Sequence, residues 1–252
     1  MDDEVRVLPL RGLPEIRQGN DLGTLLLNAA ERAPVEGLRD GDVLVVTHKI
    51  VAKAEGCSVD LRTVEPSPFA RMFAERWGKD ARQVEVVLRE SARIVRMDRG
   101  VMICETHHGF VCANAGVDRS NVGAAETVLT LPRAPDLSAQ VIRAVVSRRT
   151  GVAVAVVVSD TFGRAWREGL ANVAIGCAGL RPLRDERDRV DADGYVLKAS
   201  ILAVADELAS AAELVMGKLG GIPAAVIRGY AYDVGEGSAR ELQRAPEKDM
   251  FR

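Results

Sequence analysis

Aromatic residues, an excess of one charge and long apolar runs are all scarce in this chain of 252 residues. Aromatic residues make up 4% of it, which argues against a surface that stacks on nucleic-acid bases. The 34 basic and 36 acidic residues give a net charge of −2, so the chain has no overall positive charge to attract a polyanion or an anionic membrane. The longest apolar run, residues 152–158, is far shorter than the ~20 residues that a membrane-spanning helix needs. We therefore expect neither nucleic acid nor membrane as a partner.

Cysteine pairs with metal-binding spacing are also missing. The four cysteines form no C-x-x-C motif, which excludes a zinc knuckle and a thioredoxin-type site. Scattered thiols and an acidic N-terminus without an apolar signal segment predict a reduced, cytoplasmic protein. The Walker, dinucleotide-binding, serine-hydrolase and H-E-x-x-H motifs are absent as well. Phosphate chemistry in this chain would therefore need metal, lysine and loop amides in another framework.

Apolar residues are abundant enough for a substantial core, since 47% of the chain is hydrophobic. No linker divides the sequence, so we expect one domain over residues 1–252. The middle third alternates polar and apolar residues at 93–113, which is typical of an antiparallel meander. We predict an α+β fold with mixed sheets, an antiparallel middle region and two closely packed lobes. Further strands are expected at residues 4–10, 42–50, 152–158 and 224–227, and helices at 21–33, 68–77, 82–92, 138–149 and 199–218.

The segment that follows the most apolar strand collects several polar groups. Asp160 and Thr161 offer the hard oxygen ligands that Mg²⁺ or Mn²⁺ prefers. Arg164 and Arg167 could clamp phosphate or carboxylate oxygens. Ligands often bind at the carboxyl end of a buried strand, which favours a site here. The alternative is a helix N-cap followed by a solvated helix face.

A second polar segment contains a tight turn at Gly116, with Asp118 and Asn121 three residues apart. Asp118 could ligate a divalent cation, and Asn121 could hydrogen-bond a phosphate or a base. An Asx-turn with a helix cap explains the same residues equally simply.

Three further segments could contact a nucleotide. Lys53 could neutralise a phosphate and His48 could donate a hydrogen bond to one, although a solvated lysine and a structural histidine also fit. The loop at residues 12–16 and the glycine-rich helix end at Gly217 and Lys218 could present backbone amides to phosphate. A plain turn and a helix C-cap are the alternatives for these two segments.

Together these segments resemble one family, the coenzyme F-420-0:L-glutamate ligases, also called gamma-glutamyl ligases. Five blocks in the same order carry the resemblance: GLPEI, DGDVLVVTHKIVAKAEG, HGFVCANAGVDRSNV, VVVSDTFGRAWREG and ADELASAAELVMGKLGGIPAAVIRGY. They cover nearly the whole chain, and their joint occurrence is far more specific than any single motif.

The resemblance implies an enzyme that joins L-glutamate to the terminal carboxyl of a deazaflavin coenzyme precursor, using GTP and a divalent ion. The ion would be Mn²⁺ or Mg²⁺, with K⁺ as a further candidate, and the fold would form a homodimer. An acyl phosphate would activate the carboxyl group. The residues that the resemblance assigns to GTP are Leu13, Pro14, Glu15, Ile16, His48, Lys53, Asn121, Gly217 and Lys218. The metal ligands would be Asp118, Asp160 and Thr161. Apart from the resemblance, we expect Arg164 or Arg167 to hold a carboxylate of glutamate or the phosphodiester of the coenzyme precursor.

This chain departs from the family pattern at His48, where many members have serine. Lys218 is assigned no metal role, because an ammonium group cannot ligate a cation. Some members carry a fused flavin-binding oxidoreductase domain at the C-terminus, which we do not expect in a chain that ends at Arg252. Two other functions stay open: a metal-dependent phosphohydrolase, and a nucleotide-binding protein without turnover.

Overall fold

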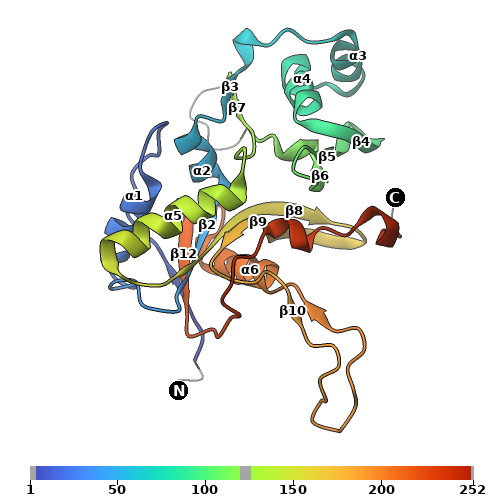
Figure 1. Ribbon diagram of the computed structural model, residues 1–252. Coiled ribbons are helices and arrows are strands. Elements are labelled where there is room, and N and C mark those ends of the chain that lie inside the picture. Colours follow the sequence, from blue (N-terminus) through green and yellow to red (C-terminus); the bar gives the residue numbers. More distant parts are fainter. Residues whose placement is uncertain (1–3, 120–125, 251–252) are drawn as a thin grey trace.

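A five-stranded mixed sheet forms the centre of the molecule (Figure 1). The computed structural model describes residues 4–119 and 126–250. The strand order is β1-β12-β2-β8-β9, in which β2 and β8 run parallel and every other pair is antiparallel. The bounds of these strands are β1 Arg6–Pro9, β2 Val43–Thr47, β8 Ala155–Arg164, β9 Arg167–Ala178 and β12 Ala224–Arg228.

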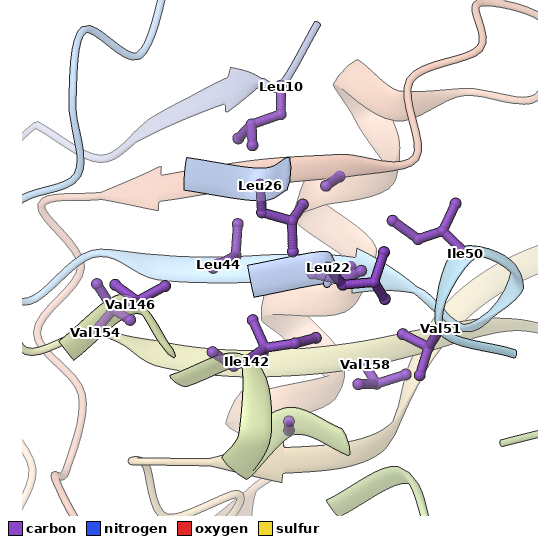
Figure 2. Close-up of a cluster of buried hydrophobic side chains, with 14 of the residues drawn as sticks. Leu10, Leu22, Leu26, Leu44, Ile50, Val51, Ile142, Val146, Val154 and Val158 are labelled. Carbon is purple, nitrogen blue, oxygen red and sulfur yellow. The ribbon is translucent and has the colours of Figure 1, made fainter. Parts of the chain in front are cut away.

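Helices cover both faces of this sheet. Helices α1 (Leu22–Ala30) and α5 (Pro135–Thr150) pack on one face, and α6 (Val204–Met216) packs on the other. Successive strand side chains point to opposite faces, so Leu44 joins the first core while Val45 joins the second. Figure 2 shows the first core, with Leu44 between Leu26 of α1 and Ile142 of α5. Burial on both sides explains why the central strands are apolar throughout.

A second lobe has its own hydrophobic core, separate from the two cores on the sheet. It contains the antiparallel sheet β4-β5-β6, the pair β3-β7 and two helices, and lies above the main sheet in Figure 1. The predicted antiparallel middle region and the α+β class are therefore confirmed. The bounds are β3 Ser58–Asp60, α3 Pro68–Trp77, α4 Ala81–Arg89, β4 Ser91–Asp98, β5 Val101–Thr106, β6 Val111–Ala113 and β7 Thr127–Leu129.

Local capping explains several helix boundaries. Asp21 accepts a hydrogen bond from the Thr24 amide and begins α1, as the sequence predicts. Ser67 caps α3, Pro68 takes its first position, and Gly78 ends it with a left-handed φ of 63°. Helix α6 begins at Val204, five residues later than expected, because the preceding residues pair as β11 (Ile201–Leu202) with β10 (Arg184–Asp185).

Two predicted strand ends are wrong in ways that matter for the site. The strand expected at 42–50 stops at Thr47, and helix α2 (His48–Glu55) begins at once. The strand expected at 152–158 continues to Arg164 and returns as β9, so the polar segment lies in a hairpin and not at a helix N-cap. Polar side chains beyond residue 158 therefore project from paired strands.

A long hairpin arm, residues 184–202, projects from the body of the molecule in Figure 1. Apolar residues on it are exposed, among them Val190 and Tyr195. Within the described ranges, no helix combines the length and the hydropathy that a bilayer crossing requires.

Candidate functional site

A cavity of about 510 Å³ opens where the parallel pairing of β2 and β8 ends. Thr47 and Ser159 are the last pair of the register, so His48, the first residue of α2, and Asp160 of β8 follow at neighbouring positions. The wall contains residues from five separate segments of the chain. They are Leu13, Pro14, Glu15, Ile16, Thr47, Lys49, Ile50, Lys53, Asp160, Thr161, Asn172, Glu213, Met216, Gly217, Lys218, Leu219, Gly221, Ile222 and Pro223.

The carboxylate of Asp160 is held from behind by His48. His48 is 1% exposed and its Nε2 lies 3.1 Å from Oδ1 of Asp160, while the Thr161 amide donates to the same oxygen at 2.6 Å. We assign the Nε2–H tautomer to His48, since Nε2 faces a carboxylate oxygen and Nδ1 is buried without a hydrogen-bond partner among the described residues. Both contacts engage Oδ1, which leaves Oδ2 of Asp160 as the oxygen that can meet a ligand in the cavity.

Two lysines of α2 line the cavity beside this carboxylate. Lys53 lies 2.7 Å from Glu15, which also lines the cavity. Lys49 lies 2.7 Å from Asp118, a residue that is not part of the cavity wall. Asp118 and Asp160 thus contact the consecutive residues Lys49 and His48, and both carboxylates lie around the start of α2.

A left-handed turn positions Asp118. The φ values of Asn114, Ala115 and Gly116 are 51°, 51° and 71°, a conformation that costs free energy for a residue with a Cβ. The turn directs the chain into a bridge between Asp118 and Leu129, where each backbone amide donates to the other residue's carbonyl group. Asn121, the other predicted residue of this segment, lies outside the described residues.

A ring of four polar side chains, which includes Thr161 next to Asp160 in the chain, lies in the wall of the cavity. The Thr161 hydroxyl donates to Oδ1 of Asn172 at 2.7 Å, and Nδ2 of Asn172 donates to Glu213 at 2.9 Å. Lys218 completes the ring, with Nζ 2.6 Å from Oγ1 of Thr161 and 2.8 Å from Oε1 of Glu213. Asn172 is 3% exposed, so the ring is anchored in the protein interior.

The sequence interpretation missed Asn172 and Glu213. Asn172 pairs with Thr161 in the β8–β9 register, which becomes visible only when the hairpin is recognised. Glu213 lies near the end of α6, one turn before Gly217. The only sequence feature that could have identified it is its position shortly before the glycine-rich end of that helix.

Most of the predicted residues meet in this cavity, and a few do not. Leu13, Pro14, Glu15, Ile16, Lys53, Asp160, Thr161, Gly217 and Lys218 all line it. His48 is buried behind the wall, and Asp118 lies beside Lys49. Arg164 and Arg167 lie at the exposed tip of the β8–β9 hairpin, where Nη2 of Arg164 donates to the Glu168 carbonyl group at 2.7 Å.

The pKa of the Cys112 thiol is influenced by the charge of Asp160, but this thiol is not a candidate nucleophile. Burial, and then the charge of Asp160, raise the pKa of Cys112 to about 12. A thiol with such a pKa stays protonated at neutral pH and is a poor nucleophile. Covalent catalysis by this cysteine is therefore disfavoured.

The oxygen donors of the cavity suit an ion that arrives with a phosphate group. Among residues 4–119 and 126–250, no cluster of three or more His, Cys, Asp or Glu side chains could enclose a metal. Mg²⁺, however, commonly takes one or two carboxylates and completes its shell with phosphate oxygens and water. Oδ2 of Asp160 meets that requirement, so the residues present fit a divalent ion bound together with a nucleotide.

A second cavity, also of about 510 Å³, lies on another side of α2. Its wall is formed by the start of α1, the end of α2 and one side of α5, and it includes Leu137 and Val141. No residue that the sequence analysis singled out lines it.

Comparisons with known proteins point to the same family as the sequence motifs. A family model described as F420-0:gamma-glutamyl ligase matches residues 12–229. The chain is 43% identical over 251 residues to the coenzyme F420:L-glutamate ligase of Methanothermobacter thermautotrophicus, covering 98% of this chain and 99% of that protein. It is 45% identical over 253 residues to the protein of that name from Methanopyrus kandleri, covering 98% of each. The match to the one from Methanocaldococcus jannaschii is 40% over 227 residues, or 90% of each. The residues matched by the family model include the whole wall of the first cavity.

Proposed function

The chain belongs to the F420-0:gamma-glutamyl ligase family, and we infer from this that it is a ligase that joins L-glutamate to a coenzyme F420 precursor through an amide bond. We propose further that GTP supplies the driving force and that the reaction passes through an acyl phosphate. A free carboxylate is a poor acceptor for an amine, because it offers no usable leaving group. Transfer of phosphate from GTP onto that carboxylate would provide one.

The observation that carries this proposal is the convergence of cationic and acidic groups along one side of α2, in the wall of the first cavity. Thr47 is the N-cap of α2 and makes no side-chain capping hydrogen bond within the described part of the chain. The N-terminus of a helix attracts anions through its first amides and its dipole. Lys49 and Lys53 add positive charge on the same helix, and both line the cavity. The arrangement suits the phosphate groups of a nucleotide.

Lys53 is the residue that we propose as the fixed positive charge. Its ammonium group now lies 2.7 Å from Glu15, whose side chain is mostly exposed. A bound phosphate could replace that exposed partner at little cost, because an exposed ion pair contributes only about 0–1 kcal/mol. Lys53 would then stabilise the charge that develops on the phosphate oxygens during transfer.

Asp160 and Thr161, together with Asp118, are the residues that we propose to hold Mn²⁺ or Mg²⁺. When bound, the ion would disperse negative charge on the phosphate groups. His48 keeps Oδ1 of Asp160 in place, which leaves Oδ2 in a constant direction toward the ligand. In this arrangement His48 acts on the carboxylate and not on the nucleotide.

The glutamate amine would then attack the activated carboxyl carbon, and phosphate would leave. Arg164 and Arg167 extend beyond the cavity on the β8–β9 hairpin, and we propose that they hold a carboxylate of glutamate or the phosphodiester of the coenzyme precursor.

The family resemblance also suggests a cytoplasmic homodimer. The apolar side chains exposed on the 184–202 arm support a subunit contact there, which light scattering of the purified protein would test.

Turnover of the full chain tests the proposed function directly. Incubation with GTP, Mn²⁺, L-glutamate and the deazaflavin precursor should yield GDP and a product heavier by one glutamyl unit. Asp160→Ala should lower the rate by at least 100-fold, because the carboxylate would hold the ion that offsets the negative charge of the phosphate groups. Unchanged turnover in this variant would refute the metal assignment.

Two other outcomes would replace the proposal. GDP that forms at the same rate without glutamate would indicate a phosphohydrolase. Tight GTP binding without GDP release, even with all substrates present, would indicate a protein that binds nucleotide without turnover.

A further inference from the structure

We propose that the ammonium group of Lys218 fills a built-in cation position between Thr161 and Glu213, and so excludes a second divalent ion from the site. Nζ of Lys218 lies 2.6 Å from Oγ1 of Thr161 and 2.8 Å from Oε1 of Glu213. Both oxygens belong to the cavity wall, next to Asp160. The position is therefore adjacent to the carboxylate to which we assign the divalent ion.

Asn172 fixes which atoms face the ammonium group. Its Nδ2 donates to Glu213 at 2.9 Å, so its Oδ1 must be the acceptor of its second hydrogen bond. The Thr161 hydroxyl donates its single proton to that oxygen, and only lone pairs remain on the side toward Lys218. Thr161 thus presents a neutral oxygen acceptor and Glu213 an anionic one. These are the hard oxygen donors that Mg²⁺ and Mn²⁺ take as ligands.

The buried anchor makes this orientation persistent. Asn172 is 3% exposed and pairs with Thr161 in the β8–β9 ladder. Glu213 lies on helix α6, which packs on one face of the same sheet. The two oxygens would therefore keep their places if Lys218 were removed. The vacated position would then be open to water and to a free cation.

The exposure of Lys218 argues against a purely stabilising role. Its side chain is 56% exposed, and ion pairs at that exposure contribute little to folding. Its charge is placed in the cavity, next to the proposed metal ligand, where it would act on a bound anion. The consequence for the proposed reaction is that one divalent ion per active site suffices, and the protein itself supplies the second positive charge. This catalytic consequence rests on the proposed function, whereas the cation position itself does not.

Equilibrium binding of Mn²⁺ tests the cation position without turnover. Free Mn²⁺ is measured by electron paramagnetic resonance during titration of the full chain with MnCl₂ as the only added ligand. Lys218→Met, which keeps the length and removes the charge, should bind one Mn²⁺ per chain more than the wild type. Lys218→Arg keeps the charge and should bind the same number as the wild type. Lys198→Met, at an exposed lysine on the arm, is the matched control and should also leave the number unchanged.

The double variant Lys218→Met with Glu213→Gln locates the additional ion. It should lose that ion, because a neutral amide replaces the anionic oxygen. Equal Mn²⁺ numbers in the wild type and Lys218→Met would overturn the proposal, and so would an additional ion that persists in the double variant. Should Lys218→Met fail to show the cooperative thermal unfolding of the wild type, Lys218→Gln takes its place in the same titration.

Failure of the proposed function would look different. A wild-type chain that binds Mn²⁺ but forms no glutamyl product would refute the ligase assignment, while the difference in ion number between wild type and Lys218→Met would be unaffected.

Discussion

Two cavities of the same volume, about 510 Å³ each, lie on different sides of helix α2. The cavity on the side of Lys49 and Lys53 is lined by lysines, carboxylates and an amide from five segments of the chain. The cavity on the side of Val51 and Ala54 is lined mainly by aliphatic side chains, many of them from α1 and α5. The comparison teaches that volume does not identify a site in this protein, whereas the meeting of distant polar residues at one sheet edge does.

The difference has a simple structural cause. The start of α2 lies where the parallel pairing of β2 and β8 ends, so residues of α2 and of the continuing strand β8 line one space. The other side of α2 faces α1 and α5, where helix packing selects apolar side chains. Residues in and beside the first cavity should therefore be the ones whose substitution affects the reaction.

The largest effect is expected from Lys53→Met. It removes a positive charge from the first cavity and should lower turnover by about 30- to 1000-fold, from a loss of about 2–4 kcal/mol of transition-state stabilisation. Steady-state rates of GDP formation measure it. The matched variant Leu137→Ser changes an exposed residue of the second cavity and should leave the rate within about two-fold. Equal losses in both variants would remove the distinction between the cavities.

A smaller effect is expected at His48. His48→Leu removes the hydrogen bond to Oδ1 of Asp160 and should lower kcat about 10-fold, since a hydrogen bond to a charged group contributes about 1.5 kcal/mol. His48→Gln retains an N–H group near Nε2 and should recover most of that loss. If the two variants have equal kcat, His48 does not act through this hydrogen bond.

The smallest effect is expected on the free energy of unfolding at alkaline pH, through the thiol of Cys112. The pKa of Cys112 is about 12 in the folded chain against 9.0 in the unfolded chain, owing to burial and to Asp160. A raised pKa stabilises the folded state below pH 9, and this contribution disappears as the pH rises from 9 toward 12. By pH 10 the free energy of unfolding should have fallen by about 1 kcal/mol on this account.

Urea unfolding at pH 8 and pH 10 measures this decrease. Cys112→Ala should remove this part of the pH dependence. Cys177→Ala is the comparison far from the cavity, since burial and the charge of Asp136 raise its pKa to about 12 as well. An unchanged pH dependence in Cys112→Ala would show that its thiol is accessible to solvent.

The fold class was largely predictable, because strong alternation and apolar runs mark the meander and the central strands. The transition from β2 to α2 was not, since the residues at 47–50 suit either element and only the neighbouring strand β8 decides it. The hairpin at 159–169 was missed for a similar reason. Its pairing is a long-range property, and its polar letters are equally typical of a helix cap.

The same distinction between local and long-range information applies to the residues of the candidate site. Residues carried by contiguous motifs, such as Glu15, Lys53 and Asp160, could be named from the sequence, and they share one cavity. Asn172 and Glu213 could not, because each depends on a partner more than ten residues away along the chain. The metal role of Asp118 and the nucleotide role of Asn121 stay predictions.

The parallel pair β2 and β8 has a consequence for how this architecture can vary. Parallel neighbours cannot be joined by a tight turn, so the chain must make a crossover between them. The entire second lobe lies within that crossover, from β3 to β7. Insertions or replacements in the lobe can therefore accumulate without shifting the register of the two strands that present His48 and Asp160. The part of the crossover that stays next to these strands, at Asp118, is the place where such changes would reach the reaction.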